Sequence, residues 1–207
     1  PANLHLITFM SNCVIEILRL DFLCAYQFMF VHLRECAVQL RTTIGSKTKE
    51  NIAALFSWSR ILPLQMWTDM IVNHPDQPEM KEMIYPLTQI IMGIYGLIDS
   101  PKYYPLKLRC LEMMCLLVKH TGVFIPLGGH MISIFEQINS KHNTRFGKFK
   151  GNASASDAKK FDFRYTLKMS KNFVETKSYL DAVVMKLSDI IIIYFSSFSY
   201  SIAFPDL

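Results

Sequence analysis

Apolar residues recur at alternating three- and four-residue steps along most of the chain, which is the spacing of one face of an α-helix. We predict helices over residues 3–19, 22–45, 47–72, 79–98, 101–120, 127–138 and 176–195. The second of these shows a regular apolar stripe, which we expect to face the core; it consists of Leu23, Tyr26, Phe30, Leu33, Ala37, Leu40 and Ile44.

Glycine and proline mark the expected helix ends. Gly45 is predicted to close the second helix, because glycine tolerates the left-handed conformation of a helix end. Ser46 is then placed to cap the next helix. Pro63 lies inside that helix, so we expect a kink or break near Leu62, where a backbone hydrogen bond is lost.

The helices over 79–98 and 101–120 indicate close packing. Gly93 and Gly96 each lower helix propensity by about 1 kcal/mol relative to Ala, and we expect a neighbouring helix to approach closely there. The next helix is apolar around most of its circumference, so it must be covered on two or more sides. Layered helical hairpins meet that requirement.

These patterns predict an all-α protein: an irregular HEAT-like α-solenoid of stacked antiparallel helices, since no strict residue repeat is visible. We expect a helical-repeat body over 1–139, a basic flexible loop with a short extended segment over 140–174, and a C-terminal helix and tail over 175–207. Because the chain starts at Pro1 and stops at Leu207, we expect it to be part of a longer protein.

Composition agrees with a helical core: 51% of the residues are hydrophobic, with Phe and Met abundant and only 8 Gly. The uncharged run over 190–204 is shorter than the ~20 residues that span a bilayer, so no membrane segment is predicted. The five cysteines lack C-x-x-C spacing, which predicts buried reduced thiols and no metal site.

The positive charge is concentrated in one segment. Residues 141–171 hold nine Lys or Arg against two Asp, a local charge of +7, while the whole chain carries +5. Cations mixed with phenylalanine are typical of nucleic-acid contacts, through phosphates and base stacking. The predicted RNA-binding residues are Arg145, Lys148, Phe149, Lys150, Lys159 and Lys160.

No constellation of catalytic residues is visible. The six histidines have no consistent partners, and Gly128-Gly129-His130 is not accompanied by a G-x-S-x-G nucleophile motif. The segment 147–152 lacks the spacing of a phosphate-binding loop. We therefore predict no catalytic residues, no cofactor and no small-molecule substrate.

Several strings of the sequence resemble the nucleolar complex protein 2 family of ribosome assembly factors. The most specific lies at 121–127, with further matches at 85–98, 104–110 and 200–205. The matching residues are Tyr85-Pro86-Leu87, Gln89-Ile90, Gly93, Leu97-Ile98, Tyr104-Pro105-Leu106, Leu108, Cys110, Thr121-Gly122, Phe124-Ile125-Pro126-Leu127 and Tyr200-Ser201-Ile202-Ala203-Phe204-Pro205.

The resemblance implies a non-enzymatic scaffold in the nucleolus and nucleus that supports assembly of the large ribosomal subunit (pre-60S). It implies a heterodimer with another HEAT-like nucleolar complex protein, and binding to the pre-ribosomal particle, its proteins and ribosomal RNA. A histone- or chromatin-binding nuclear regulator is the alternative function, for which an acidic tract would be needed. An enzyme is a third class, which a convergent polar pocket would support.

Overall fold

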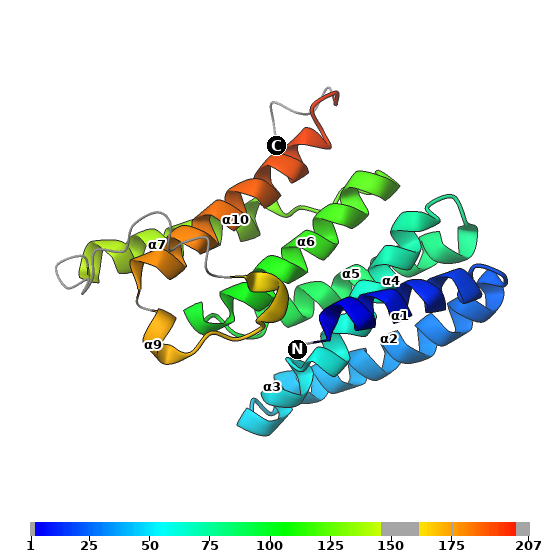
Figure 1. Cartoon of the computed structure of the whole chain (residues 1–207), viewed down its shortest axis with the longest axis horizontal. Helices are drawn as coiled ribbons and strands as arrows, with labels where there is room; N and C mark the ends of the chain where they lie inside the picture. Colours follow the sequence, from blue (N-terminus) through cyan, green and yellow to red (C-terminus); the bar gives the residue numbers. More distant parts are fainter. Residues whose placement is uncertain (1–2, 146–161, 175, 202–207) are drawn as a thin grey trace. The chain divides into compact units, whose positions relative to one another are not determined.

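The computed structural model describes residues 3–145, 162–174 and 176–201, with the backbone alone for residues 4 and 139–145. All regular secondary structure of these residues is helical, which confirms the all-α prediction (Figure 1). The chain forms two compact units: Pro1–Asp99 with His120–Gly122, and Ser100–Lys119 with Val123–Leu207. The HEAT-like stacking and the three-part organisation stay predictions.

The first unit begins with a helical hairpin, α1 (Leu4–Leu18) followed by α2 (Phe22–Gly45). The carboxylate of Asp21 caps α2 by accepting hydrogen bonds from the amides of Leu23 and Cys24, at 3.0 and 3.1 Å. The second helix ends at Gly45, as predicted, but not through a left-handed glycine. In the part of the chain that the structure describes, the glycine with positive φ is Gly122, at 68°.

The stretch predicted as one broken helix is two helices, α3 (Lys49–Leu55) and α4 (Trp58–Asn73). The break lies at Ser57, not near Leu62, because Ser57 takes an extended conformation that starts α4. Pro63 lies inside α4, where its ring removes one backbone donor without ending the helix. The prediction of a proline break near Leu62 was therefore wrong, and the interruption at Ser57 was not predicted.

The cap of α3 also differs from the prediction. The Thr48 hydroxyl accepts a hydrogen bond from the amide of Asn51 at 3.2 Å, which is an N-cap interaction. Ser46 instead donates its hydroxyl to the carbonyl of Thr42 at 3.1 Å, and so belongs to the end of α2. The difference follows from where α3 begins: its first residue is Lys49, so Thr48, not Ser46, lies just outside the first helical turn.

The core of the first unit is the contact of α2 with α5 (Pro78–Gly96), which α4 also joins. The predicted inner stripe of α2 was partly wrong: Leu33 and Leu40 are buried, but Leu23, Phe30 and Ile44 are exposed. The face that packs inward is shifted and has smaller residues; it consists of Ala25, Met29, Leu33, Cys36, Leu40 and Thr43.

One of the two glycines of α5 has the close neighbour that we expected. Leu40 lies directly over Gly93, where a side chain would collide with it. Gly96 has nothing within 4 Å of the position of an added Cβ, so the prediction was wrong there. The apolar row of α5 is buried, namely Ile84, Leu87, Ile91 and Ile94.

The second unit is built from α6 (Tyr104–Thr121), α7 (Gly128–Arg145) and α10 (Lys177–Ser196), with the turn η1 (Pro101–Tyr103) before α6. Nearly every residue of α6 from Tyr104 to Val118 is buried, as its apolar circumference predicted. The next helix, α7, continues to Arg145 and is longer than the predicted 127–138.

An irregular segment, residues 162–170, crosses α6 and leads into the short helix α9 (Lys171–Val174); we call this segment the strap. It begins with the turn η3 (Phe163–Tyr165). Leu167 and Met169 are buried and Lys168 is exposed, but Phe163–Tyr165 and Lys171–Val174 are helical, so only the short stretch between them has the extended character expected of this region.

Candidate interaction surfaces

The first helix presents most of its apolar residues to solvent. Its exposed positions follow four- and three-residue steps along one side, and Phe9 and Ile17 are 64% and 66% exposed. Of the α1 side chains that the structure describes, only Ile15 is fully buried. The exposed apolar residues of α1 are Leu6, Phe9, Met10, Val14 and Ile17.

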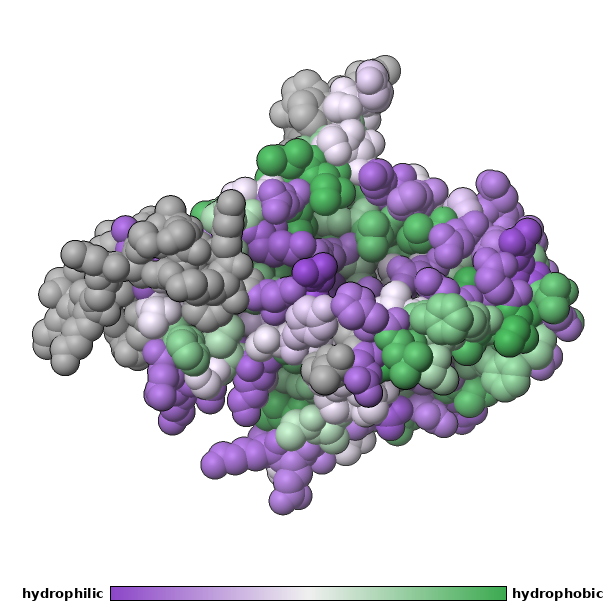
Figure 2. Space-filling model, viewed as in Figure 1, coloured by the Kyte–Doolittle hydropathy of each residue, from purple (hydrophilic) through white to green (hydrophobic). Residues whose placement is uncertain are grey.

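The outer side of α2 also exposes apolar residues, interspersed with the exposed charged residues Arg34, Glu35 and Arg41. Its exposed apolar residues include Leu23, Phe28, Phe30, Val31 and Val38. Figure 2 shows hydrophobic side chains gathered along α1 and α2, at the right of the view. We call these exposed residues of α1 and α2 the hairpin surface.

A surface of this kind calls for a covering partner. Single exposed apolar residues are ordinary, but a contiguous set on adjacent helices marks an interaction site. Charge is sparse on the first helix, where Glu16 is the only acidic or basic residue besides His5. None of the helices in the described residues is long and apolar enough to cross a bilayer. The chemistry of the hairpin surface fits contact with another apolar helix face.

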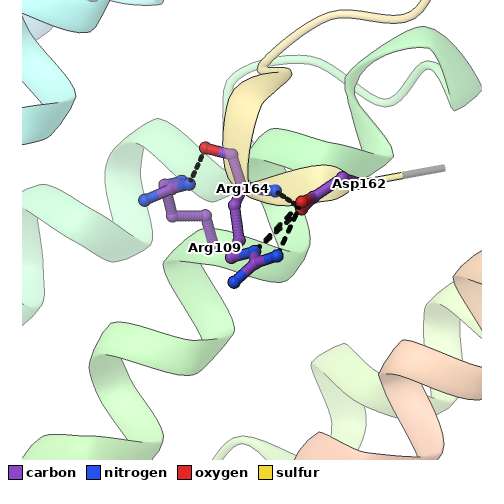
Figure 3. A network of polar contacts seen from close by, with 3 residues as sticks. All are labelled: Arg109, Asp162 and Arg164. Atoms are coloured by element: carbon purple, nitrogen blue, oxygen red, sulfur yellow. Dashed lines mark hydrogen bonds and ion pairs between the residues drawn. The ribbon is translucent and has the colours of Figure 1, made fainter. Parts of the chain in front are cut away.

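The strap of the second unit is fastened by a buried arginine (Figure 3). The guanidinium of Arg109, on α6, donates a hydrogen bond to the carbonyl oxygen of Arg164 at 2.7 Å. Burial lowers the pKa of Arg109, whereas Glu112 opposes that change. The side chain of Arg164 points away to Asp162, with which it forms hydrogen bonds of 2.8 to 3.1 Å. These bonds lower the pKa of Asp162.

Beside this network lies a cavity of about 400 Å³ between α6, the strap and α10. Its lining mixes both charges with apolar side chains, and Lys186 and Glu112 are joined there as an ion pair. Among the described residues no group of His, Cys, Asp and Glu could hold a metal ion. The described lining of the cavity holds carboxylates and cations but no Ser, Cys or His.

Most of the predicted RNA-binding residues lie outside the described part of the chain. Arg145 is the last residue of α7, and its backbone alone is described. The other predicted residues, Lys148, Phe149, Lys150, Lys159 and Lys160, fall within 146–161. Their positions relative to one another are therefore not tested, and their role in RNA binding stays a prediction.

The cysteines follow the prediction in part. Cys36, Cys110 and Cys115 are buried free thiols, and burial raises the pKa of Cys110 and of Cys115 to about 12. Thiols held in the neutral form are poor nucleophiles. Cys13 is exposed, contrary to the prediction, because it lies on the solvent side of α1 near Met10 and Ile17.

Sequence reasoning missed the hairpin surface, although a signal for it was present. The stretch over 4–18 is apolar around most of its circumference, and such a helix must be covered on more than one side. In the structure its inner side rests on the first unit while Leu6, Phe9 and Ile17 remain exposed. The described residues thus define a helical protein with exposed apolar side chains on its first two helices.

Comparison with known proteins gives the family. The family model described as "Noc2p family" matches residues 1–207, so the chain belongs to the Noc2p family. It is 34% identical over 201 residues to "Nucleolar complex-associated protein 2" of Arabidopsis thaliana, covering 97% of this chain and 25% of that protein. It is 29% identical to "Nucleolar complex protein 2" of Drosophila melanogaster, covering 100% of this chain and 26% of that protein.

The family membership confirms the resemblance seen in the sequence. The chain spans about a quarter of the length of these relatives, so it corresponds to one part of them. A homologue in Caenorhabditis elegans, "Nucleolar complex protein 2 homolog", is 29% identical over 174 residues. The names of these relatives agree with the nucleolar and nuclear localisation expected from the sequence.

Proposed function

We propose that this protein is a non-enzymatic nucleolar assembly factor in the biogenesis of the large ribosomal subunit, acting as a protein- and RNA-binding scaffold. Family membership supports a role in a nucleolar complex. The observation that carries the scaffold role is the hairpin surface, an exposed apolar face on two adjacent helices, α1 and α2.

The proposed occupant of the hairpin surface is a helical face of another HEAT-like nucleolar complex protein, giving a heterodimer. Leu6, Met10 and Val14 lie in one row at four-residue steps, which forms a ridge that fits the groove of a facing helix. Phe9 and Phe28 add aromatic area of the kind that dominates the energetics of protein interfaces.

Ribosomal RNA is the second proposed partner, within the pre-60S particle and beside its proteins. The support is the local charge of +7 over residues 141–171. Positive charge of this density binds phosphates with a strong dependence on salt. The residues proposed for this contact remain Arg145, Lys148, Phe149, Lys150, Lys159 and Lys160.

A pair of matched substitutions tests the protein contact. Ile17 of the hairpin surface and Ile192 of α10 are each 66% exposed, so Ile17→Glu and Ile192→Glu add the same charge at equal exposure. We expect Ile17→Glu to reduce recovery of the HEAT-like partner with the tagged full-length protein at least tenfold, since a charge buried in an apolar interface is costly. Ile192→Glu should leave recovery unchanged.

Circular dichroism melts of both variants establish that each is folded. Equal recovery of the partner with Ile17→Glu and Ile192→Glu would remove the hairpin surface from the proposal. Recovery of large-subunit precursors in the same purifications reports separately on the particle, because RNA-mediated association does not require an apolar contact.

A further inference from the structure

The strap holds its exposed side chains on a backbone that is fixed from both ends. Arg109 donates to the carbonyl oxygen of Arg164 at 2.7 Å, near the start of the strap. Near its end, the amide of Met169 donates to the carbonyl oxygen of Lys102 at 2.8 Å. Since Leu167 and Met169 are buried between these bonds, the alternate residues must face outward.

The outward side of this anchored segment collects cations from two parts of the chain. Lys168 is exposed, and its ammonium lies 5.9 Å from the centre of the Tyr103 ring. Lys102 is half-buried next to Tyr103, and its carbonyl holds the strap. Lys171 is exposed at the start of α9, which packs against η1.

These lysines have no acidic partner among the residues that the structure describes. The ion pairs of the described side chains join other groups, and the strap's own acid, Asp162, is bound to Arg164. An unneutralised cluster at an anchored site attracts an anionic ligand. The charges of Lys102, Lys168 and Lys171 are therefore available for binding.

Aromatic side chains accompany the cations and narrow the choice of ligand. Phe173, on α9, is 51% exposed, and Tyr103 is half-buried beneath Lys168. An acidic peptide needs cations alone, whereas single-stranded RNA uses cations for its phosphates and aromatic rings for its bases. The mixture favours RNA.

We infer that Lys102, Lys168, Lys171 and Phe173 form a contact surface for single-stranded RNA; this inference rests on the RNA binding proposed above and extends it to a second, structurally anchored place. The lysines contact phosphates and Phe173 stacks on a base. Periodicity could not have paired Lys102 with Lys168, because the pairing depends on the hydrogen bond between Lys102 and Met169.

Binding of a fluorescein-labelled single-stranded RNA oligonucleotide to the whole chain, followed by fluorescence anisotropy over a range of salt concentrations, tests the inference. The strap variant carries Lys102→Gln, Lys168→Gln and Lys171→Gln. The matched control carries Lys47→Gln, Lys49→Gln and Lys81→Gln, which removes three exposed lysines of the first unit and gives the same net charge.

We expect the strap variant to bind RNA at least about tenfold more weakly than the control at 0.1 M salt, with a salt slope smaller by about 2, since each phosphate contact on a single strand contributes about 0.7. Phe173→Ala should weaken binding by about tenfold through lost stacking without changing the salt slope. Thermal melts check that each variant is folded.

A loop variant with Arg145, Lys148, Lys150, Lys159 and Lys160 changed to Gln separates the two RNA proposals. If the strap variant matches its control while the loop variant loses binding, the strap inference is wrong and the proposed function stands. If the strap variant alone loses binding, the strap inference holds and the loop residues are wrong. If the unmodified chain binds no RNA, both RNA proposals fail.

A polyglutamate peptide tests the alternative partner. If the strap variant loses binding to this peptide while its RNA binding is unchanged, the inference is overturned in favour of an acidic protein partner.

Discussion

Leu40 of α2 occupies the space over Gly93 of α5, where an added Cβ would collide with the end of the Leu40 side chain. The contact lies where α2 and α5 form the core of the first unit. The absence of a side chain at Gly93 therefore has a packing cause, whereas the absence at Gly96 has none in the described structure.

Substitution of the two glycines by alanine should have opposite effects. Gly96→Ala should raise the free energy of unfolding by about 0.5 to 1 kcal/mol, because alanine favours the helix and nothing obstructs its Cβ. Gly93→Ala gains the same propensity but collides with the buried Leu40, and overpacking costs about 1 to 3 kcal/mol, so a net loss is expected.

Urea denaturation of the two variants provides the measurement, each acting as the control for the other. Equal stabilisation by Gly93→Ala and Gly96→Ala would show that Leu40 moves aside without cost.

Tyr194 should be important for the stability of the second unit. Its hydroxyl donates to the carbonyl oxygen of Ile125 at 2.8 Å and accepts from the amide of Leu127 at 3.4 Å. Tyr194→Phe removes both bonds and leaves buried backbone groups unpaired, which should cost about 1 to 3 kcal/mol.

Chemical denaturation followed by circular dichroism checks this effect. Tyr200→Phe is the matched control, because Tyr200 is fully exposed and should lose nothing measurable. A Tyr194→Phe variant as stable as the control would mean that water replaces the phenol at Ile125 and Leu127.

The stability of the folded protein should depend on pH through Asp69. Burial raises the pKa of Asp69 from 3.8 to about 6, so the folded state disfavours its ionised form. The protein should lose stability from this group as the pH rises from about 4 to above 6. Asp69→Asn should therefore raise stability by about 1 kcal/mol at pH 8, allowing for the partial exposure of the carboxylate, and by nothing at pH 4.

Thermal melts at pH 4, 6 and 8 test both the direction and the size of the stability change caused by Asp69→Asn. Asp76→Asn, at an exposed position, is the control and should give parallel curves. A stabilisation by Asp69→Asn that is constant with pH would exclude ionisation as its cause.

The all-α fold class and most helix ends could be predicted from the sequence, but the inward face of α2 could not. Leu33 and Leu40 belong both to the predicted stripe and to the buried one, so periodicity alone could not choose between the two. The choice depends on which face fits against α5, and the space over Gly93 is set by packing between helices distant in sequence.

The candidate sites, too, could be predicted from the sequence only in part. Leu167 and Met169 are buried on either side of the exposed Lys168, but the turns at Phe163–Tyr165 and Lys171–Val174 were not predicted from the sequence. The anchoring of the strap was not visible, because the acceptors of its bonds are the backbone carbonyls of Arg164 and Lys102, which carry no sequence signal. The predicted RNA-binding residues from Lys148 to Lys160 lie outside the described residues and stay a prediction.

The attachment of the strap through peptide oxygens has a consequence for how this region can vary among members of the family. Every amino acid supplies a main-chain carbonyl, so the outward residues can be replaced without loss of the attachment. The attachment and the RNA contact inferred above thus depend on different atoms. New specificities can arise along this segment by exchange of side chains alone, provided that the arginine beneath it and the apolar residues between its two attachment points are kept.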